Sequence, residues 1–472
     1  MKKAGERSSL IIFKHGVDEQ GATMKKIIKF CVDYPYWIIC LVLLATILFS
    51  FQLFKIKIDP RVEIFLQQNN PVEKDFRANK KEFAPYADIL IGMLHSDIYT
   101  STSLKKIEVI TEEIKAIKGV QKVTSILTAK TIKGNESGFV VTPMSPEGIA
   151  PSTEQDIATF REKVGSWDIY DDIYITKDGK GTAIVVALSE NIETDQIVPI
   201  YYQLQNIIKK HEGPEQFFIS GTKVVEALQG DYMMKDLKLL IPLVILILLA
   251  SLFLFFRNVR GMILPLISVA ISCAWTMGLM AILKIPITMV TSALPIALMA
   301  VSSAYGIHVL ENVLSDSSNG HKGKEGILNS LYRVALPVIM AGLTTVVSFI
   351  SLCTTSIVPI TQFGFLSAFG IFNALIISLT FVPAVLSLLD KYNMEHISHH
   401  HTSKDLIGPI LNWLSRVTIS HSSLILVTAL FLLFFSIFGA LQMKSDLNLI
   451  EDFRKDSPIR IADEILNKHF GG

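Results

Sequence analysis

The chain has 472 residues, of which 50% are hydrophobic and 18% are charged, and its mean hydropathy is +0.43. The apolar residues occur in long continuous blocks. This pattern excludes a soluble protein and predicts a polytopic membrane protein. The formal net charge is only +1, so nothing in the overall charge suggests nucleic acid as a partner.

The first membrane span is predicted at residues 36–54, after a cytoplasmic N-terminus of residues 1–35. Basic residues flank spans on the cytoplasmic side, and seven precede this one. A cleaved signal peptide is the alternative, but the long basic region and the lack of a small-x-small site after Ser50 favour an uncleaved anchor. The seven basic residues are Lys2, Lys3, Arg7, Lys14, Lys25, Lys26 and Lys29.

Residues 55–236 are predicted to form an extracytoplasmic α/β domain. Apolar alternation predicts two β-α-β sets within it, an order typical of a ferredoxin-like fold. The Gly-, Ser-, Pro- and Asp-rich residues 127–180 between the two sets predict an inserted loop region. The first set is a strand at 88–94, a helix at 103–117 and a strand at 120–126; the second is a strand at 181–188, a helix at 197–210 and a strand at 216–220.

Residues 237–389 are predicted to form a cluster of five spans, which brings the total to seven with the last span, 424–441 within residues 423–442. Loop charge places the short basic link 257–261 and the segment 311–333 in the cytoplasm, and the turns 284–288 and 354–361 outside. The cytoplasmic linker 390–422 includes an apolar stripe at 406–417, which predicts an interfacial helix. Residues 443–472 are predicted to begin a second extracytoplasmic domain. The five spans are 239–256, 261–283, 289–312, 334–353 and 362–389.

The span at 289–312 carries polar side chains near one end. Val301, Tyr305, His308 and Asn312 fall at i, i+4, i+7 and i+11, which places them on one helix face, and Glu311 is close by. A polar face inside hydrocarbon is costly unless it points at protein or water, so it is a candidate site for ion coupling. The alternative is that Glu311 and Asn312 only mark the cytoplasmic exit and that His308 is a neutral packing residue.

Hydroxyl groups follow a second stripe at Thr344, Ser348 and Ser351, spaced i, i+4 and i+7. This stripe is a second coupling candidate, although small hydroxyl residues often only allow helices to pack closely. No catalytic residue, bound metal or cofactor is expected, and we find no nucleotide-binding or protease motif. A histidine cluster in the cytoplasmic linker could hold a divalent metal, but a solvated, metal-free loop is the simpler interpretation. Its members are His396, His399, His400 and His401.

An internal repeat joins the segment around the first span to the segment around the last. The two segments align without a gap at a constant shift of 387 residues, which indicates duplication. The chain is therefore expected to hold one repeat and the start of another, as half of a transporter. The matched pairs are Lys29 and Arg416, Lys57 and Lys444, Asp59 and Asp446, Pro71 and Pro458, Lys81 and Lys468, and Phe83 and Phe470.

This plan resembles the resistance-nodulation-division superfamily of membrane exporters. Within it, the sequence is most similar to hydrophobe or lipid exporters of the MMPL type, whose five-span cluster is also the sterol-sensing domain of Patched-like proteins. In proton-driven members of the superfamily an aspartate precedes the tyrosine of the polar helix, whereas this chain has Ala304. The residues that carry the resemblance are Asp59-Pro60, Asn70-Pro71, Ala304 to His308, Gly342 to Thr345, Gln362 to Gly364, and Pro383.

The resemblance implies a multi-pass transporter of the plasma membrane that moves a hydrophobic or lipid-like substrate, driven by an ion gradient, and that is not an enzyme. Tyr305, His308, Glu311, Thr344 and Ser348 are then the candidate coupling residues. Expected partners are membrane lipids, the substrate, and a second repeat, partner half or further copy of the chain. The competing interpretation is a non-transporting membrane protein, either a sterol-sensing-like regulator or an accessory subunit of protein export.

Overall fold

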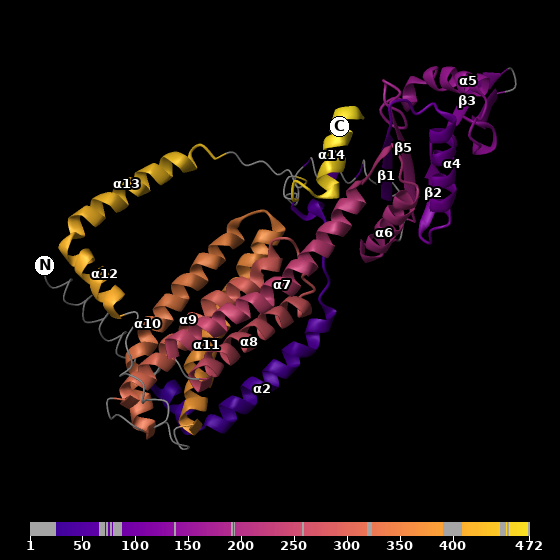
Figure 1. Cartoon of the computed structure of the whole chain (residues 1–472). Coiled ribbons are helices and arrows are strands. Elements are labelled where there is room, and N and C mark those ends of the chain that lie inside the picture. Colours follow the sequence, from indigo (N-terminus) through magenta and orange to yellow (C-terminus); the bar gives the residue numbers. More distant parts are fainter. Residues whose placement is uncertain are drawn as a thin grey trace. The chain divides into compact units, whose positions relative to one another are not determined.

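The computed structural model divides the chain into two compact units (Figure 1). The helical unit comprises residues 1–59 and 235–445, and the α/β unit comprises residues 60–234 and 446–472. The structure describes residues 25–65, 87–135, 138–189, 194–256, 259–318, 323–389, 408–443 and 453–470, together with a few isolated positions between these ranges.

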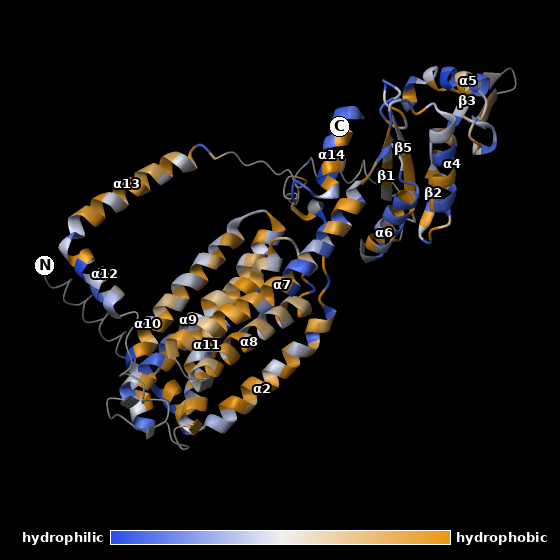
Figure 2. Cartoon of the chain, in the orientation of Figure 1, coloured by the Kyte–Doolittle hydropathy of each residue, from blue (hydrophilic) through white to orange (hydrophobic). Residues whose placement is uncertain are grey.

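The helical unit consists of long apolar helices, seven of which, among the described residues, are long and apolar enough to cross a membrane. Hydrophobic residues cover these helices along most of their length (Figure 2). The prediction of a mainly helical protein with seven spans is therefore confirmed. The helices are α2 (Pro35–Gln52), α7 (Thr222–Phe256), α8 (Val259–Ile282), α9 (Leu294–Ser318), α10 (Gly323–Ser351), α11 (Val358–Leu389) and α13 (Ser422–Ala440).

Two helix boundaries differ from the sequence prediction. Helix α9 begins at Leu294 rather than at residue 289, because Thr288 and Thr291 exchange hydrogen bonds that hold the preceding residues in a turn: the Thr288 amide donates to Thr291 Oγ1 at 2.7 Å and the Thr291 amide to Thr288 Oγ1 at 3.2 Å. Residues 311–333 are mostly helical rather than a loop, since α9 continues to Ser318 and α10 starts at Gly323.

Glycines let the helices approach closely. A Cβ on Gly306 of α9 would lie 3.3 Å from the Cα of Pro265 in α8, and a Cβ on Gly364 of α11 would lie 2.7 Å from the Phe349 carbonyl oxygen of α10. The contact at Gly364 leaves no room for a Cβ, and the contact at Gly306 is tight; close approaches of this kind are typical of membrane helix pairs. They explain why Gly306 and Gly364 stand within two of the sequence motifs.

The α/β unit is built around a four-stranded sheet of β1 (Ala87–Leu94), β2 (Val120–Thr124), β5 (Gly181–Leu188) and β6 (Gln216–Ser220). The strand order is β2-β5-β1-β6, and every neighbouring pair is antiparallel. Both β-α-β sets lie where the alternation predicts them, with α4 (Ser101–Lys115) and α6 (Thr194–Lys210) as their helices.

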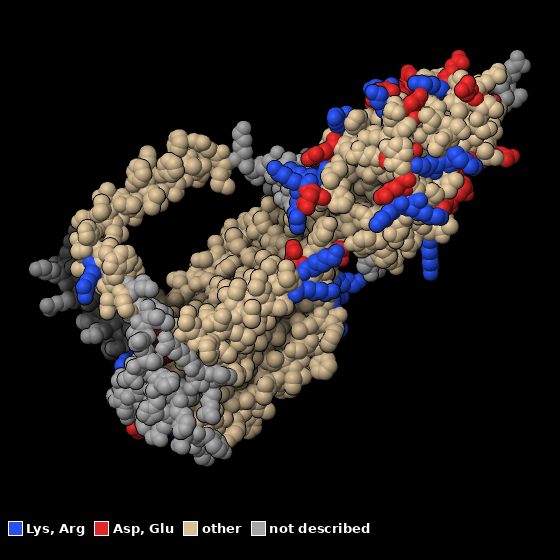
Figure 3. All heavy atoms as spheres, viewed as in Figure 1, with Lys and Arg blue, Asp and Glu red and all other residues tan. Residues whose placement is uncertain are grey.

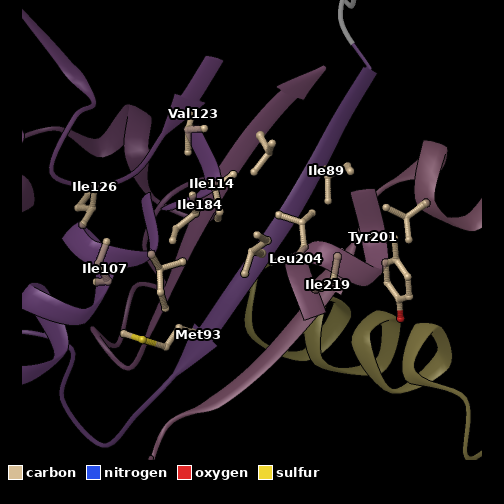
Figure 4. Close-up of a cluster of buried hydrophobic side chains, with 14 of the residues drawn as sticks. Ile89, Met93, Ile107, Ile114, Val123, Ile126, Ile184, Tyr201, Leu204 and Ile219 are labelled. Atoms are coloured by element: carbon tan, nitrogen blue, oxygen red, sulfur yellow. The ribbon is translucent and has the colours of Figure 1, made fainter. Parts of the chain in front are cut away.

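One face of this sheet forms the main core (Figure 4). Ile89, Ile91 and Met93 of β1 alternate along the strand and are buried there with residues from both helices, among them Ile107 and Leu204. This period of two is the pattern that predicts the strand from sequence. Charged side chains crowd the surface of the α/β unit and are nearly absent from the helices of the helical unit on the face shown in Figure 3.

The opposite face of the sheet is covered by a helix from the C-terminal segment, α14 (Pro458–His469). Ala183 and Phe218 of the sheet are buried against Ala462 and Phe470, and the rings of Phe218 and Phe470 lie 6.1 Å apart in an edge-to-face arrangement. Residues 446–472, expected to begin a second domain, thus belong to the same compact unit as residues 60–234.

The region 127–180 is not a simple loop, contrary to the prediction. It contains the hairpin of β3 (Lys130–Asn135) and β4 (Gly138–Pro143) and the helix α5 (Glu154–Gly165). Helix α5 starts where the Thr153 hydroxyl accepts a hydrogen bond from the Asp156 amide, a local cap that the Pro- and Ser-rich composition conceals.

The repeat is visible in the helix breaks. Helix 25–33 ends at a bend at Tyr34 before α2, and α12 (Gly408–Ser420) ends at a turn at His421 before α13. His421 follows Tyr34 by 387 residues, the shift found in the sequence. In the described residues both copies therefore have a helix, a single-residue break and an apolar span in this order.

Candidate functional site

A groove of about 460 Å³ lies between α9 and α10 in the helical unit. Its walls are mostly apolar, and three side chains, Tyr305, His308 and Thr345, bring polar atoms to it. Among these described residues there is no carboxylate. Its lining is Val301, Ala304, Tyr305 and His308 from α9, and Val334, Pro337, Val338, Ala341 and Thr345 from α10.

Helical spacing puts the α9 residues on this wall. Val301, Tyr305 and His308 lie one turn apart along one helix face, as the sequence predicts. Tyr305 is buried, whereas Ala304 and His308 are exposed at the open side of the groove. The fourth member of that face, Asn312, donates from Nδ2 to the backbone oxygen of His308 at 2.9 Å and does not line the groove.

A polar clasp fixes one end of the α9–α10 pair. Asp316 of α9 accepts hydrogen bonds from the Ser330 hydroxyl and the Arg333 guanidinium of α10. Ser330 is fully buried, and the Asp316 side chain is only 14% exposed. The Arg333 side chain is 67% exposed, so water screens its charge, and the buried Ser330 hydroxyl is the shielded partner of Asp316. Both hydrogen bonds join α9 to α10 at this end of the groove.

A backbone bridge fixes the chain at the other end of α9. The Asp59 amide donates to the Ile287 oxygen, and the Ile287 amide donates to the Lys57 oxygen, both at 2.8 Å. Ile58 and Ile287 form the resulting parallel bridge. The segment that leaves α2 is thereby joined to the turn that precedes α9.

The candidate residues divide into two groups in the structure. Tyr305 and His308 meet in the groove, whereas Glu311 is exposed outside its lining. Thr344 and Ser348 are exposed and donate to carbonyl oxygens of their own helix, at Ala341 and Thr344, both at 2.8 Å.

Sequence reasoning did not single out the α10 wall of the groove. Thr345 faces the groove although its neighbour Thr344 does not, and Pro337 and Ala341 lie one and two turns away on the same wall. The i, i+4, i+8 spacing of 337, 341 and 345 is a signal that could have identified this face.

Metal binding has no support in the described part of the chain, where no three His, Cys, Asp or Glu side chains gather as a metal site would require. The histidine cluster of residues 396–401 lies outside the described residues.

Comparison with known proteins connects this helical arrangement to one family. A family model for the MMPL family matches residues 64–433. A proposed membrane protein of Methanocaldococcus jannaschii is 22% identical over 385 residues, an alignment that covers 79% of this chain and 96% of that protein. Seven apolar helices together with this match identify a multi-pass membrane protein.

Proposed function

This chain belongs to the MMPL family, and on that basis we propose that it is a transporter that moves a hydrophobic or lipid-like substrate and draws its energy from an ion gradient. The observation that carries the proposal is the groove between α9 and α10, which brings Tyr305 and His308 together among apolar side chains. Predominantly apolar walls with a few polar groups are typical of sites for small amphipathic ligands.

His308 is the proposed ion-coupling residue. Histidine is the residue type suited to binding and releasing protons under physiological conditions, and His308 is the one histidine of the described groove lining. Ala304 occupies the position where the resemblance leads one to expect an aspartate, so proton binding has to fall on another group. Tyr305, one turn away, is the neighbour that orients the ring, and Glu311 lies outside the groove.

The proposal is tested by transport in proteoliposomes that contain the full chain, with a fluorescent phospholipid as the probe substrate and an imposed pH gradient. His308→Asn keeps polarity but removes titration, so gradient-dependent movement of the probe should fall while uptake without a gradient is retained. Thr345→Val, inside the groove, should also reduce transport. Thr344→Val is the matched control, because the adjacent hydroxyl bonds to the same Ala341 carbonyl oxygen but lies outside the groove. Equal activity of all three variants and the parent would contradict the proposal.

A non-transporting membrane partner is the second candidate, and one observation favours it. The described lining of the groove has no acidic side chain, whereas the resemblance implies an aspartate beside the tyrosine in proton-driven members of the superfamily. If the unmodified chain binds the phospholipid probe but does not move it when a pH gradient is imposed, this second function is supported instead.

The α/β unit is proposed to be a ferredoxin-like domain outside the membrane. Its strand order β2-β5-β1-β6, with two β-α-β sets and only antiparallel neighbours, supports this assignment. We also propose a plasma-membrane location with a cytoplasmic N-terminus, and the basic residues that precede the first span support this orientation. We further propose that a second repeat or a second copy of the chain covers the open side of the groove, since polar groups at membrane depth are costly when they face lipid.

A further inference from the structure

Helix 25–33, just before the first span, has three distinct faces. Ile28, Cys31 and Val32 are buried against the helical unit. On another face Ile27, Phe30 and Tyr34 are 54%, 53% and 54% exposed, at the i, i+3, i+7 spacing of one helical stripe. The third face carries Lys25, Lys26 and Lys29, all exposed.

Two contacts tether this helix to the first turns of α10. Lys25 Nζ lies 5.5 Å from the centre of the Tyr332 ring, and Tyr332 Oη donates to the Lys25 backbone oxygen at 3.4 Å. Lys324 Nζ lies 4.0 Å from Asp33 Oδ1. The helix is thus held in one orientation, which leaves its apolar stripe and the other two lysines uncovered.

Asp33, at i+4 from Lys29, is the one acidic residue of helix 25–33, and its ion pair is with Lys324 of α10. Within the described residues, neither Lys26 nor Lys29 forms an ion pair or a hydrogen bond. An apolar stripe beside exposed lysines is the pattern of a helix that lies in the surface of a membrane with anionic lipids.

The position of helix 25–33 directly before a membrane span indicates that its binding partner is the lipid surface. The apolar span α2 starts at Pro35, immediately after the bend at Tyr34, so helix 25–33 cannot leave the membrane surface. Tyr36 and Trp37 follow at once and are more than 70% exposed, as expected for side chains at the level of the headgroups.

A similar helix precedes the span in the second copy of the repeat. Helix α12 precedes α13 across a one-residue break, and Arg416 stands at the repeat position of Lys29. Leu414, at the repeat position of Ile27, is likewise exposed. A basic and an apolar residue thus recur at matching positions before both spans.

We propose that helix 25–33 is a binding site for anionic phospholipid headgroups, which Lys26 and Lys29 contact while Ile27, Phe30 and Tyr34 enter the hydrocarbon beside them. The site is independent of the groove between α9 and α10. It anchors the start of the first span at a leaflet that carries negative lipid.

The test uses the full chain in nanodiscs that contain equal amounts of phosphatidylcholine and phosphatidylglycerol, with retained lipids counted by native mass spectrometry. The unmodified chain should retain phosphatidylglycerol preferentially. Each lysine near an anionic surface contributes roughly fivefold to binding, so Lys26→Gln/Lys29→Gln should lower this preference by about 25-fold. Lys118→Gln/Lys122→Gln makes the same charge change at two exposed lysines of the α/β unit and should leave the preference unchanged.

The apolar stripe is tested separately with Ile27→Ser/Phe30→Ser, which keeps every charge. In nanodiscs of phosphatidylcholine alone, amide hydrogen exchange of residues 25–33 should become faster in this variant than in the unmodified chain. Equal lipid preference in the two lysine double variants would overturn the proposal, and so would unchanged exchange in the serine variant. Complete displacement of the lipid by soluble glycerol phosphate would assign the lysines to a free phosphate and would also overturn it.

Discussion

The ring of Phe218 lies directly over Gly92, its partner on the neighbouring strand. A Cβ added to Gly92 would come within 1.9 Å of that ring, so the glycine is what allows Phe218 to lie flat on the sheet and meet Phe470 of α14. Ala183, the partner of Gly92 on the other side, is also small. Ala183, Gly92 and Phe218 are thus neighbours across three strands and form the surface on which α14 packs.

Gly92→Ala should destabilise the α/β unit by about 1 to 3 kcal/mol, because overpacking forces Phe218 away from its position. Gly165→Ala is the control, since a Cβ there meets no atom within 4 Å. Urea unfolding can be followed through Trp167, the only tryptophan of this unit, in a chain whose other three tryptophans are changed to phenylalanine. The double variant Gly92→Ala/Phe218→Leu should recover part of the loss; purely additive effects would contradict the contact.

Lys106→Met should cost about 3 to 5 kcal/mol, because it leaves a buried carboxylate without its partner. Lys106 Nζ lies 2.5 Å from Glu215 Oε2, and the Glu215 side chain is 1% exposed. Lys105→Met is a matched control at the neighbouring residue. Lys105 forms an ion pair with Glu108, but the Lys105 side chain is 61% exposed. There the expected change is below about 1 kcal/mol. Equal losses in the two variants would contradict the importance of burial.

The same ion pair predicts how stability depends on pH. Burial is the largest single influence and raises the pKa of Glu215. The hydrogen bond from Lys106, a backbone hydrogen bond and the nearby positive charge together outweigh burial, so the net pKa lies below the ordinary 4.5. The pair therefore stabilises the α/β unit fully above pH 4.5, and this contribution is lost as the pH falls through the lowered pKa. In Lys106→Met burial dominates and raises the pKa, so the Glu215 contribution should instead be lost as the pH rises. The urea midpoint, measured from pH 3 to pH 7, should rise more steeply with pH in the unmodified chain than in Lys106→Met. The same pH dependence of the midpoint in both chains would refute this prediction.

Phe470→Ala should release α14 from the sheet, with about 3 kcal/mol lost at a buried aromatic contact. Ile461→Ala is the control on the same helix, since Ile461 is 41% exposed. Hydrogen exchange of residues 458–469 should become faster only in the first variant. Slow exchange in both would mean that other contacts hold the helix.

Ala341→Leu should fill the groove between α9 and α10. The larger side chain takes up space that the probe would occupy, and a penalty of about 1 to 3 kcal/mol on filling the groove corresponds to a roughly 5- to 150-fold loss in transport of the phospholipid probe. Met340→Leu, at the next residue, changes a side chain outside the groove and should leave transport intact. Equal transport by the two variants would argue against substrate or ion passage through the groove.

Cysteines placed at Asn135 and Ser318 test the topology in a chain whose four native cysteines are changed to serine. A membrane-impermeant maleimide should label position 135 in intact cells and position 318 only after the membrane is opened. The expected difference follows from the basic residues that flank the spans. Equal labelling at both positions in intact cells would refute the orientation.

The sequence predicted the elements whose hydrophobic period is strong, and it was wrong where single side chains set a boundary. The strands 181–188 and 216–220 have the predicted limits, because their apolar residues face a packed core. The start of α9 was placed five residues too early because the exchange of hydrogen bonds between Thr288 and Thr291 leaves no trace in hydropathy. In the groove, helical spacing placed Tyr305 and His308 on one face, but it could not show which face of α10 lies opposite them.

The parallel backbone bridge between Ile58 and Ile287 ties the end of the first span to the turn that precedes α9. Its two hydrogen bonds join strands that run parallel, so a pull along the chain at Pro60 loads both bonds together in shear instead of opening them one after the other. Tension on the segment that leaves α2 is therefore passed at Ile287 to the turn just before α9. Helix α9 then connects this turn to the groove wall that carries Tyr305 and His308.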